Sequence, residues 1–547
     1  MIGSRRRGSV AAILLALAAA ALLYAFWLCR TPLCVGWYRD DGVYVVTGKA
    51  IAEGRGPRLD YLPGAPLMTK YPLLWPGTLA AVIAVTGARS EDLTGPLVVL
   101  PNAIFLPLAL LAFAAILTRS WRLPGAAAAI LVLALGVNPS ILELARVPMS
   151  ETLYLALTLG AIALADADPD RPSRARETLA ALLAVAALHT RLAGVALVLA
   201  LVIAFAARRR AWACVFTLAL AGTTLAAWSA FLHYAAAVET AARAEPLFAY
   251  DLGYGGDLPQ GIGGLLQAVG HDGPPAAFYA AALALGRAGP QALLDRAASG
   301  GPALPLAALV LGYLALAAAG IVARARRGTA PLLQRAETFY VPIAFGIVLL
   351  WPEETFRLLV PLAPWLITLP VAAAARLPRG AVFAAAAAAA LLLLAVADGR
   401  HNLPPPGQFR AGNTTVDTRS LDRALDAVRA LPPGARVGTS MGPLVHLRTG
   451  QIAVDSWIGP RMVGPYVPGK TLRTFYLTGG RPDLDRATRA VGATLEAYPR
   501  YGVRYAFSRR FPADDFFLVV VGALPGARAL YRSDDYALYA LPLAPPP

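Results

Sequence analysis

The sequence predicts a polytopic α-helical membrane protein that carries a small α/β domain at its C-terminal end. Of the 547 residues, 57% are hydrophobic and only 15% are charged, whereas a soluble domain has roughly a quarter of its residues charged. Long apolar segments reach or approach the ~20 residues that a helix needs to cross a membrane. Basic residues gather in the short segments between them. Most of the chain is therefore expected to lie in lipid.

The first element is predicted to be a retained signal anchor. Three arginines at residues 5–7 precede an apolar run over residues 10–28, which is longer than the ~7–15 residue core of a cleaved secretory signal. Arginines that flank a membrane helix favour the cytoplasmic side. We therefore place the N-terminus in the cytoplasm and the loop that follows outside the inner (plasma) membrane.

Further basic clusters divide the remaining apolar segments into alternating crossings. The segment 178–207 lies between two such clusters and is interrupted by His189-Thr190-Arg191, so it is predicted to form a hairpin of two short helices. About 11 transmembrane helices result, and the C-terminus lies outside. The other spans are predicted near residues 95–118, 124–139, 150–166, 211–233, 302–323, 336–351, 356–375 and 380–397.

Two domains are expected. The membrane domain covers residues 1–398 and includes two outer loops, at about residues 29–94 and 234–300. The extracytoplasmic α/β domain covers residues 399–547 and opens with a proline-rich connector; turn residues separate its short strand-like and helical patterns. Strands are predicted at residues 436–439, 505–507, 516–521 and 536–539, and helices at residues 420–431 and 484–498.

Composition excludes several other classes of protein. The formal net charge of +16 could suggest a nucleic-acid partner, but basic residues are distributed among the short loops between apolar spans, as orientation signals are, and no nucleic-acid-binding motif accompanies them. Three cysteines are too few for a disulfide scaffold or a cysteine-rich metal site. The loop at 234–300 lacks metal-ligand spacing, and its His271-Asp272 pair is interpreted as an ordinary loop pair. We predict no nucleic acid partner, no metal and no cofactor, with a divalent cation left open.

The first outer loop carries the most informative residues. An acidic pair follows the first membrane helix, an aromatic residue comes three positions later, and a Lys-x-Pro-Leu motif lies further on. Two later segments belong to the same set of motifs: a Ser-Glu pair at the start of a later span, and Arg357 at the outer start of a late membrane helix. The segments read Trp37-Tyr38-Arg39-Asp40-Asp41-Gly42-Val43-Tyr44, Lys70-Tyr71-Pro72-Leu73, Ser150-Glu151-Thr152-Leu153-Tyr154 and Phe356-Arg357-Leu358-Leu359-Val360-Pro361.

Together these segments resemble family 39 glycosyltransferases, which include protein O-mannosyltransferases and the lipid A aminoarabinose transferase. The resemblance extends to about residue 375. It implies the glycosyltransferase C fold and the inverting transfer of a sugar from a polyprenyl-phosphate donor to a hydroxyl on the outer face of the membrane. The acceptor would be a protein, a lipid or a cell-envelope glycan, and membrane lipids would surround the enzyme.

Such a transfer needs a base, because an acceptor hydroxyl is a poor nucleophile near neutral pH. Asp40 is the predicted base. Asp41 replaces the glutamate often found second in the family pair, and it is expected to support the base or to orient the acceptor. An Asp-Asp pair beside a glycine is by itself usually a solvated turn. Its position after the first helix, together with Lys70 and Arg357, therefore supports the catalytic interpretation.

The leaving group is a lipid phosphate whose negative charge grows as the glycosidic bond breaks, so that cations beside it lower the barrier. Lys70 matches the family position, although a lysine at the membrane interface can also be a simple anchor. Arg357 lies at the outer start of a membrane helix, where a charge is costly unless it faces a polar cavity. Arg146, His189 and Arg191 are weaker candidates for donor-phosphate binding, and anchoring of the hairpin tip is the alternative for the last two.

Two non-enzymatic hypotheses stay open. A transporter or flippase for a polyprenyl-linked substrate would favour paired repeats with broken helices and charges near the membrane midplane, but the sequence has no convincing internal repeat. A non-catalytic membrane scaffold would act through its outer α/β domain. Convergence of Asp40, Lys70 and Arg357 on one cavity would support an enzyme, and side chains that point apart would support the scaffold.

Overall fold

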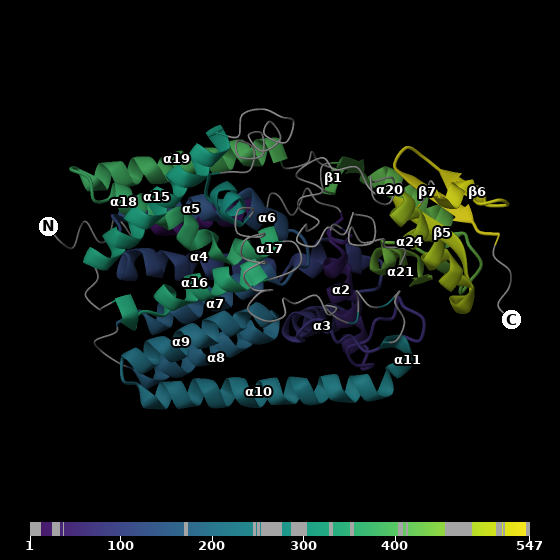
Figure 1. The fold of residues 1–547 in the computed structure, drawn as a ribbon, viewed down its shortest axis with the longest axis horizontal. Helices are drawn as coiled ribbons and strands as arrows, with labels where there is room; N and C mark the ends of the chain where they lie inside the picture. The colour runs from purple at the N-terminus through teal and green to yellow at the C-terminus, as the bar shows by residue number, and fades with distance from the viewer. Residues whose placement is uncertain are drawn as a thin grey trace.

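A helical bundle and a β-sheet region lie at opposite ends of the molecule in the computed structural model (Figure 1). The helices run roughly along the long axis, and α10 follows one edge of the bundle. The structure describes residues 12–24, 33–36, 38–168, 173–243, 248, 252, 276–285, 304–327, 332–350, 355–402, 408–411, 414–454, 484–509, 517 and 520–542.

The bundle is built from helices that are apolar along most of their length. α7 packs against both α4 and α8, and α15 packs on α18, α19 on α5 and α16 on α9. Their bounds are α4 (Asn102–Ala115), α5 (Gly125–Gly136), α6 (Pro139–Ala145), α7 (Glu151–Ala165), α8 (Arg174–Thr190), α9 (Val195–Ala207), α10 (Ala211–Val238), α15 (Leu304–Arg327), α16 (Ala336–Leu350), α17 (Thr355–Leu359), α18 (Ala363–Ala374) and α19 (Gly380–Asn402).

Several of these helices could cross a membrane. By length and composition, 4 helical segments of the described residues qualify, or up to 5 if a bent pair counts as one span. Shorter apolar helices occupy several of the other predicted spans, among them the first helix, Ala12–Tyr24. The predicted total of about 11 crossings stays a prediction. The qualifying segments are Pro96–Ser120, Ala211–Val238, Arg357–Ala374 and Gly380–Gly399.

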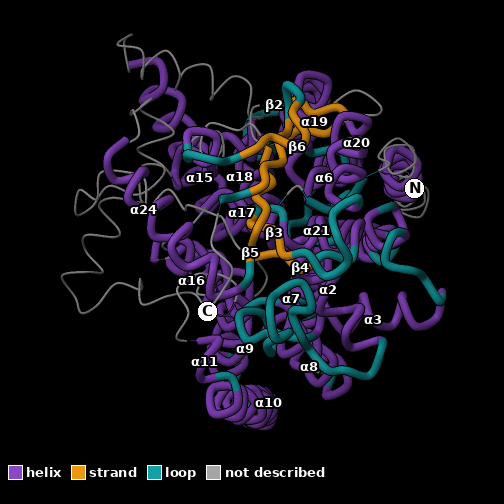
Figure 2. The backbone as a smooth tube through the Cα atoms, turned by 90° about the vertical axis from the view of Figure 1, so that its right-hand side faces the viewer, coloured by secondary structure: helices purple, strands orange, loops and turns teal. Residues whose placement is uncertain are grey.

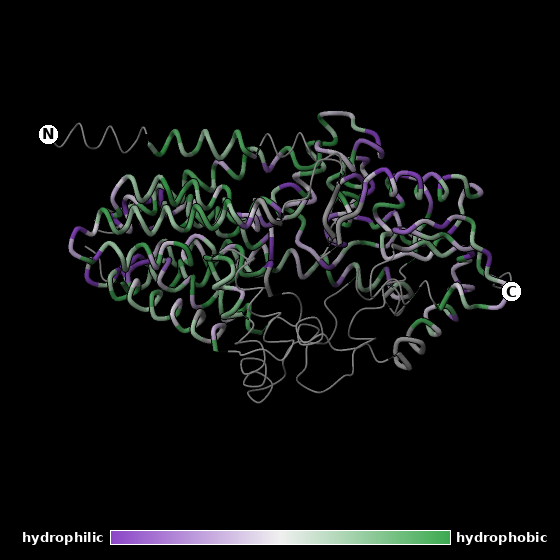
Figure 3. Tube along the Cα trace, turned by 90° about the horizontal axis from the view of Figure 1, so that it is seen from above, coloured by the Kyte–Doolittle hydropathy of each residue, from purple (hydrophilic) through white to green (hydrophobic). Residues whose placement is uncertain are grey.

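Large apolar side chains cover the outward faces of the bundle. Ile104 on α4, Trp212 and Leu218 on α10 and Leu393 on α19 are all more than half exposed. Hydrophobic residues predominate along the bundle, whereas the opposite end of the molecule is more hydrophilic (Figure 3). Water-soluble proteins rarely expose large contiguous apolar surfaces. The outward faces of the bundle are therefore those of a membrane protein.

The predicted spans need one correction, and one unusual prediction is confirmed. The predicted span 124–139 contains the shorter helix α5, which ends at Gly136, and α6 continues beyond the predicted span at an angle of 50°. The Asn138 side chain caps α6 by accepting a hydrogen bond from the Ser140 amide at 3.0 Å, and a proline begins the new helix, as suits its fixed φ angle. The segment 178–207 does form two helices, α8 and α9.

The first outer loop contains two helices that pack against each other, α2 (Arg39–Ala52) and α3 (Leu74–Thr86). Gly48 allows this approach, because a Cβ atom at this position would lie 3.0 Å from the Leu79 Cβ atom. α3 ends at Gly87, which adopts the left-handed conformation with φ of 63°, as is common at helix C-termini. α3 was not predicted from the sequence.

A five-stranded mixed sheet follows the membrane helices, in the strand order β4-β3-β5-β7-β6. Strands are coloured orange in Figure 2. β3 pairs in parallel with β4 and β5, whereas β7 is antiparallel to both β5 and β6. Its bounds, with those of the accompanying helices and hairpin, are β1 (Gln408–Ala411), β2 (Thr414–Asp417), α20 (Thr418–Arg429), β3 (Arg436–Gly438), α21 (Gly442–Thr449), β4 (Ile452–Val454), α24 (Leu484–Ala497), β5 (Val503–Arg509), β6 (Arg528–Arg532) and β7 (Tyr536–Ala540).

Two predictions for this region need correction. The run 516–521 was predicted as a strand, but Phe517 and residues 520–523 are helical. Periodicity alone does not distinguish a strand from a buried helix in so short an apolar run. α19 continues to Asn402, so the predicted domain boundary at residue 398 falls inside this helix. The outer location of the sheet stays a prediction.

The sheet region contacts the first outer loop through α21, which packs on α2. A Cβ atom at Gly42 would lie 2.5 Å from the Pro443 Cβ atom, and one at Gly36 would lie 2.7 Å from the Leu444 Cδ2 atom. Real Cβ contacts are essentially never this short, so the absence of side chains at both glycines permits the close approach. As a result, α21 contacts the turn of α2 that carries the acidic pair.

Candidate active site

Asp40 lies buried at the first turn of α2, where its carboxylate has two partners from distant parts of the chain. The Tyr71 hydroxyl donates a hydrogen bond to Oδ1 at 2.6 Å, and the Arg357 Nη1 atom donates one to Oδ2 at 2.9 Å. The residue is 7% exposed. A carboxylate at this position is also favoured by the positive end of the helix dipole. Asp40 and Arg357, two of the predicted site residues, are therefore in direct contact.

Arg357 connects three segments of the fold. It lies in α17, and its Nε atom donates to Glu151 Oε1 at 3.1 Å while its Nη1 atom holds Asp40. Its guanidinium also lies over the Tyr38 ring, 5.1 Å from the ring centroid, within the range of a cation–π contact. The planar fork of an arginine suits such a bridge between two carboxylates.

Arg191 joins the same cluster from the tip of the α8–α9 hairpin. Its Nη1 atom lies 2.6 Å from Glu151 Oε1, the oxygen that Arg357 also contacts. It also donates to the Ser150 hydroxyl at 3.2 Å, and the Tyr44 hydroxyl lies 3.4 Å from the same oxygen. These contacts tie the hairpin tip to the start of α7 and to α2. Arg191 is thus part of the same cluster of side chains.

Lys70 completes the positive side of the cluster. Its side chain is buried, with 3% exposed, and its Nζ atom lies 5.2 Å from the centroid of the Tyr71 ring. The same tyrosine bonds Asp40.

Burial alone would raise the pKa of Asp40, but the charges of Arg357 and Lys70 and the hydrogen bonds from Tyr71 and Arg357 outweigh the effect of burial. Together they hold the pKa of Asp40 well below its usual range. Asp40 is therefore ionised at neutral pH.

This lowered pKa predicts a specific dependence of stability on pH. A carboxyl whose pKa is lower in the folded than in the unfolded state stabilises the fold above its unfolded pKa, about 3.9 for aspartate, and this contribution is lost as the pH falls towards the folded pKa. The difference in Tm between wild type and Asp40→Asn should stay constant from about pH 5 to 7 and change only below about pH 4. A change centred near neutral pH, measured by thermal unfolding in detergent, would contradict this assignment.

Asp41 has a different environment from Asp40. Its Oδ2 atom accepts hydrogen bonds from the backbone amides of Gly36 and Tyr38, at 3.1 and 3.0 Å, and its Oδ1 atom accepts one from the Gly42 amide at 2.6 Å. The side chain is completely buried. These contacts fix the turn that leads into α2, and none of them supports the predicted catalytic role.

Arg146 and His189 lie outside the centre of the cluster. Arg146 is buried at the end of α6, where Glu143 and Tyr38 are its electrostatic neighbours. The Tyr38 hydroxyl donates to Glu143 at 2.5 Å, so this pair lies between Arg146 and Arg357, whose guanidinium contacts the Tyr38 ring. The His189 Nε2 atom is buried without a hydrogen-bond partner among the described residues. Neither residue therefore gains support as a phosphate ligand.

Glu151 and the hydroxyls of Tyr71 and Ser150 had no role predicted from the sequence. The spacing of these residues along the chain gives no indication that they meet. One feature could have identified Glu151, because an acidic side chain inside an apolar span is costly and usually functional. Glu151 begins such a span and is 2% exposed.

The long outer loop contributes contacts to the first loop where the structure describes it. The Thr69 hydroxyl donates to the Leu252 carbonyl at 2.6 Å, and the Leu67 amide donates to Glu239 at 3.4 Å. His271-Asp272 lies outside the described residues. Within the described ranges, no group of three or more His, Cys, Asp or Glu side chains could hold a metal ion.

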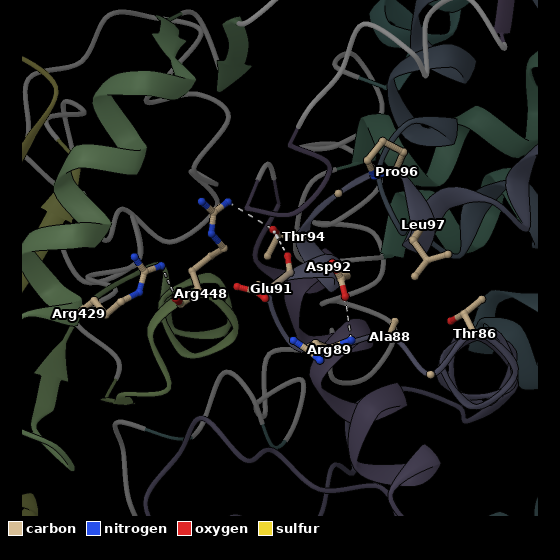
Figure 4. Close-up of a pocket in the computed structure, with 12 residues that line it drawn as sticks. Thr86, Ala88, Arg89, Glu91, Asp92, Thr94, Pro96, Leu97, Arg429 and Arg448 are labelled. Atoms are coloured by element: carbon tan, nitrogen blue, oxygen red, sulfur yellow. Dashed lines mark hydrogen bonds between the residues drawn. The ribbon is translucent and has the colours of Figure 1, made fainter.

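A separate hollow lies between the first outer loop and the C-terminal sheet region (Figure 4). It has a volume of about 680 Å³. Arg448 of α21 reaches across it to the Thr94 hydroxyl at 3.4 Å, and Arg89, Glu91 and Asp92 line the opposite side. No residue of the Asp40 cluster lines this hollow, so it is distinct from the candidate active site.

Solved structures resemble this chain, although no family model and no curated protein sequence matches it. The oligosaccharyltransferase of Archaeoglobus fulgidus, in complex with Zn and sulfate, matches with a TM-score of 0.52 and 14% identity, over 90% of this chain and 68% of that one. AglB from the same organism, in complex with an inhibitory peptide and a dolichol-phosphate, matches with a TM-score of 0.51 and 14% identity, over 96% and 74%. The chain has the fold of these oligosaccharyltransferases.

This result confirms the glycosyltransferase C-type fold that the sequence predicted. ArnT from Cupriavidus metallidurans, bound to undecaprenyl phosphate, is also similar, with a TM-score of 0.43 and 16% identity over 96% of this chain and 97% of that one. Membership of family 39 stays a prediction.

Proposed function

We propose that the protein is an inverting glycosyltransferase that moves a sugar from a polyprenyl-phosphate donor to an acceptor hydroxyl on the outer face of the cell membrane. The observation that carries this proposal is the buried Asp40 carboxylate, which is held by Tyr71 and Arg357 beside Lys70. Residues far apart in sequence meet here within a glycosyltransferase C-type fold. A carboxylate and several cations together are the groups that glycosyl transfer from a phosphate requires.

In the proposed reaction the acceptor oxygen attacks the anomeric carbon from the face opposite the phosphate. The bond between the anomeric carbon and the phosphate oxygen breaks, and the polyprenyl phosphate leaves with the electron pair. Asp40 takes the proton of the acceptor hydroxyl. Arg357, Lys70 and Arg191 stabilise the negative charge that grows on the phosphate. The configuration at the anomeric carbon is inverted.

The lowered pKa of Asp40 is compatible with this role only if its surroundings change in the reaction. While Arg357 holds Asp40 at 2.9 Å, the carboxylate is a weak base. A donor phosphate that draws Arg357 towards itself would weaken this pair and raise the basicity of Asp40. The base would thus become effective when the donor is bound.

Three further observations support the proposal. The site begins directly after the first apolar helix, and the arginines at residues 5–7 favour a cytoplasmic N-terminus, which would place the site at the outer face. The related archaeal AglB structure contains a dolichol-phosphate, which supports a polyprenyl phosphate as the lipid. The convergence of Asp40, Lys70 and Arg357 favours an enzyme over a scaffold.

The proposal is tested by reconstituting the wild-type protein in liposomes with a panel of radiolabelled polyprenyl-phosphate sugars that includes mannose, aminoarabinose and hexosamine donors. We expect release of free undecaprenyl or dolichyl phosphate from one class of donor, well above that of protein-free liposomes. Detergent extracts of the host membrane serve as the source of acceptor. The Asp92→Asn variant, with its change in an exposed part of the same loop, should release as much as wild type. No release from any donor in the presence of extract would contradict the proposal.

A further inference from the structure

Two arginines converge on a single oxygen of Glu151. Arg191 Nη1 lies 2.6 Å and Arg357 Nε 3.1 Å from Oε1. The other carboxylate oxygen, Oε2, is buried and has no hydrogen-bond partner among the described residues. A buried acceptor without a partner costs free energy, so this arrangement is not the one that would best stabilise the fold.

We propose that Glu151 is a positioning residue that holds Arg191 and Arg357 together and limits the positive charge of the donor-phosphate site. This inference rests on the proposed function, because the two arginines matter as a pair only if they receive a phosphate. Two guanidinium groups at such close range repel each other unless an anion lies between them. Glu151 supplies that anion before the donor arrives.

The position of Glu151 also fixes the direction of Arg357. With its Nε atom bonded to Glu151, Arg357 presents its Nη1 atom to Asp40. Arg191 is fixed at the same time by the Ser150 hydroxyl at 3.2 Å. Both guanidinium groups are therefore oriented by the start of α7.

A neutral residue in place of Glu151 would change the net charge of the cluster and therefore its affinity for a phosphate. The cluster has three cations, Lys70, Arg191 and Arg357, and two carboxylates, Asp40 and Glu151. Loss of the Glu151 charge would leave more net positive charge around a bound phosphate, which would then bind more tightly. The arginines would also lose their common anchor, so that the donor would be held less precisely for reaction. Tighter phosphate binding and slower turnover should therefore occur together.

This combination separates positioning from a merely structural role, because loss of structure would weaken both properties. We expect Glu151→Gln to bind undecaprenyl phosphate and dolichyl phosphate about tenfold more tightly than wild type. Its turnover of the donor identified with wild type should fall by about 10- to 100-fold. Binding is measured in nanodiscs by native mass spectrometry, and turnover by release of labelled lipid phosphate at saturating donor.

A second variant covers the case in which Glu151→Gln does not fold. Glu151→Asp keeps the charge but shortens the side chain, so its affinity for the lipid phosphates should stay within about twofold of wild type while turnover falls by about tenfold. Glu91→Gln, in the exposed part of the first outer loop, is the matched control and should change neither property.

Equal or weaker phosphate binding by Glu151→Gln, or unchanged turnover in both variants, would overturn the role of Glu151. These outcomes differ from failure of the proposed function itself. In that case the wild-type protein would neither bind the lipid phosphates nor release them from any donor.

Discussion

Replacement of Arg357 by glutamine should lower glycosyl transfer by about 10²- to 10³-fold, the cost typical of removing a group that stabilises charge in a transition state. Arg357 bonds both Asp40 and Glu151. Without its charge, the departing phosphate loses a cation. The effect should fall mainly on kcat, because the phosphate charge is greatest in the transition state. Binding of undecaprenyl phosphate should also weaken, which is opposite to the result expected for Glu151→Gln.

The Arg357→Gln variant also leaves two buried carboxylates without their shared cation, which can destabilise a protein by about 3–5 kcal/mol. Arg357→Lys separates this effect from catalysis. It restores the charge but not the planar fork that bridges Asp40 and Glu151, so its kcat should lie between those of wild type and Arg357→Gln. Arg89→Gln, in the exposed part of the outer loop, is the matched control. A folded Arg357→Gln protein with wild-type kcat would exclude Arg357 from the mechanism.

The sequence was sufficient to select Asp40 and Arg357 as site residues, but it did not predict that their side chains bond each other. Asp40 and Arg357 are 317 positions apart, and periodicity does not bring them together. They were selected because an acidic pair after the first membrane helix and an arginine at the outer start of a late helix resemble one family. A charged side chain in lipid is costly unless it faces a polar cavity, which also indicated a functional role for Arg357. For Lys70 and Arg191 the same argument left an anchoring role open, and their neighbours became visible only in the structure.

Other features were beyond prediction for physical reasons. The pair Asp40-Asp41 looks symmetric in sequence, yet one carboxylate faces Arg357 and Tyr71 while the other binds backbone amides. Adjacent residues on a helix point in different directions, and the chain on either side determines which one faces the cluster. The bend between α5 and α6 depends on the cap formed by Asn138. The helical turn at residues 520–523 depends on tertiary packing, which overrides local preference.

Asp40→Asn should reduce transfer by about 10²- to 10⁴-fold, the range by which a positioned base accelerates reactions. The change keeps the size of the side chain and one oxygen, which can still accept from Arg357, while the new amide nitrogen can donate to the Tyr71 hydroxyl. Donor binding should therefore persist, and the removal of a negative charge near the phosphate should strengthen it. Asp41→Asn is expected to act differently, because Asp41 bonds the backbone at the start of α2. It should lower Tm by more than it lowers the kcat of the folded fraction.

The central claim is that the Asp40 carboxylate activates the acceptor in transfer from a polyprenyl phosphate. The most direct test is a single-turnover measurement in proteoliposomes, in which wild type and Asp40→Asn are saturated with the same labelled donor before acceptor is added. We predict rapid formation of an inverted glycoside and release of the lipid phosphate by wild type, and donor that is bound but not cleaved by Asp40→Asn. Equal rates of cleavage by the two proteins would contradict the assignment of Asp40 as the base.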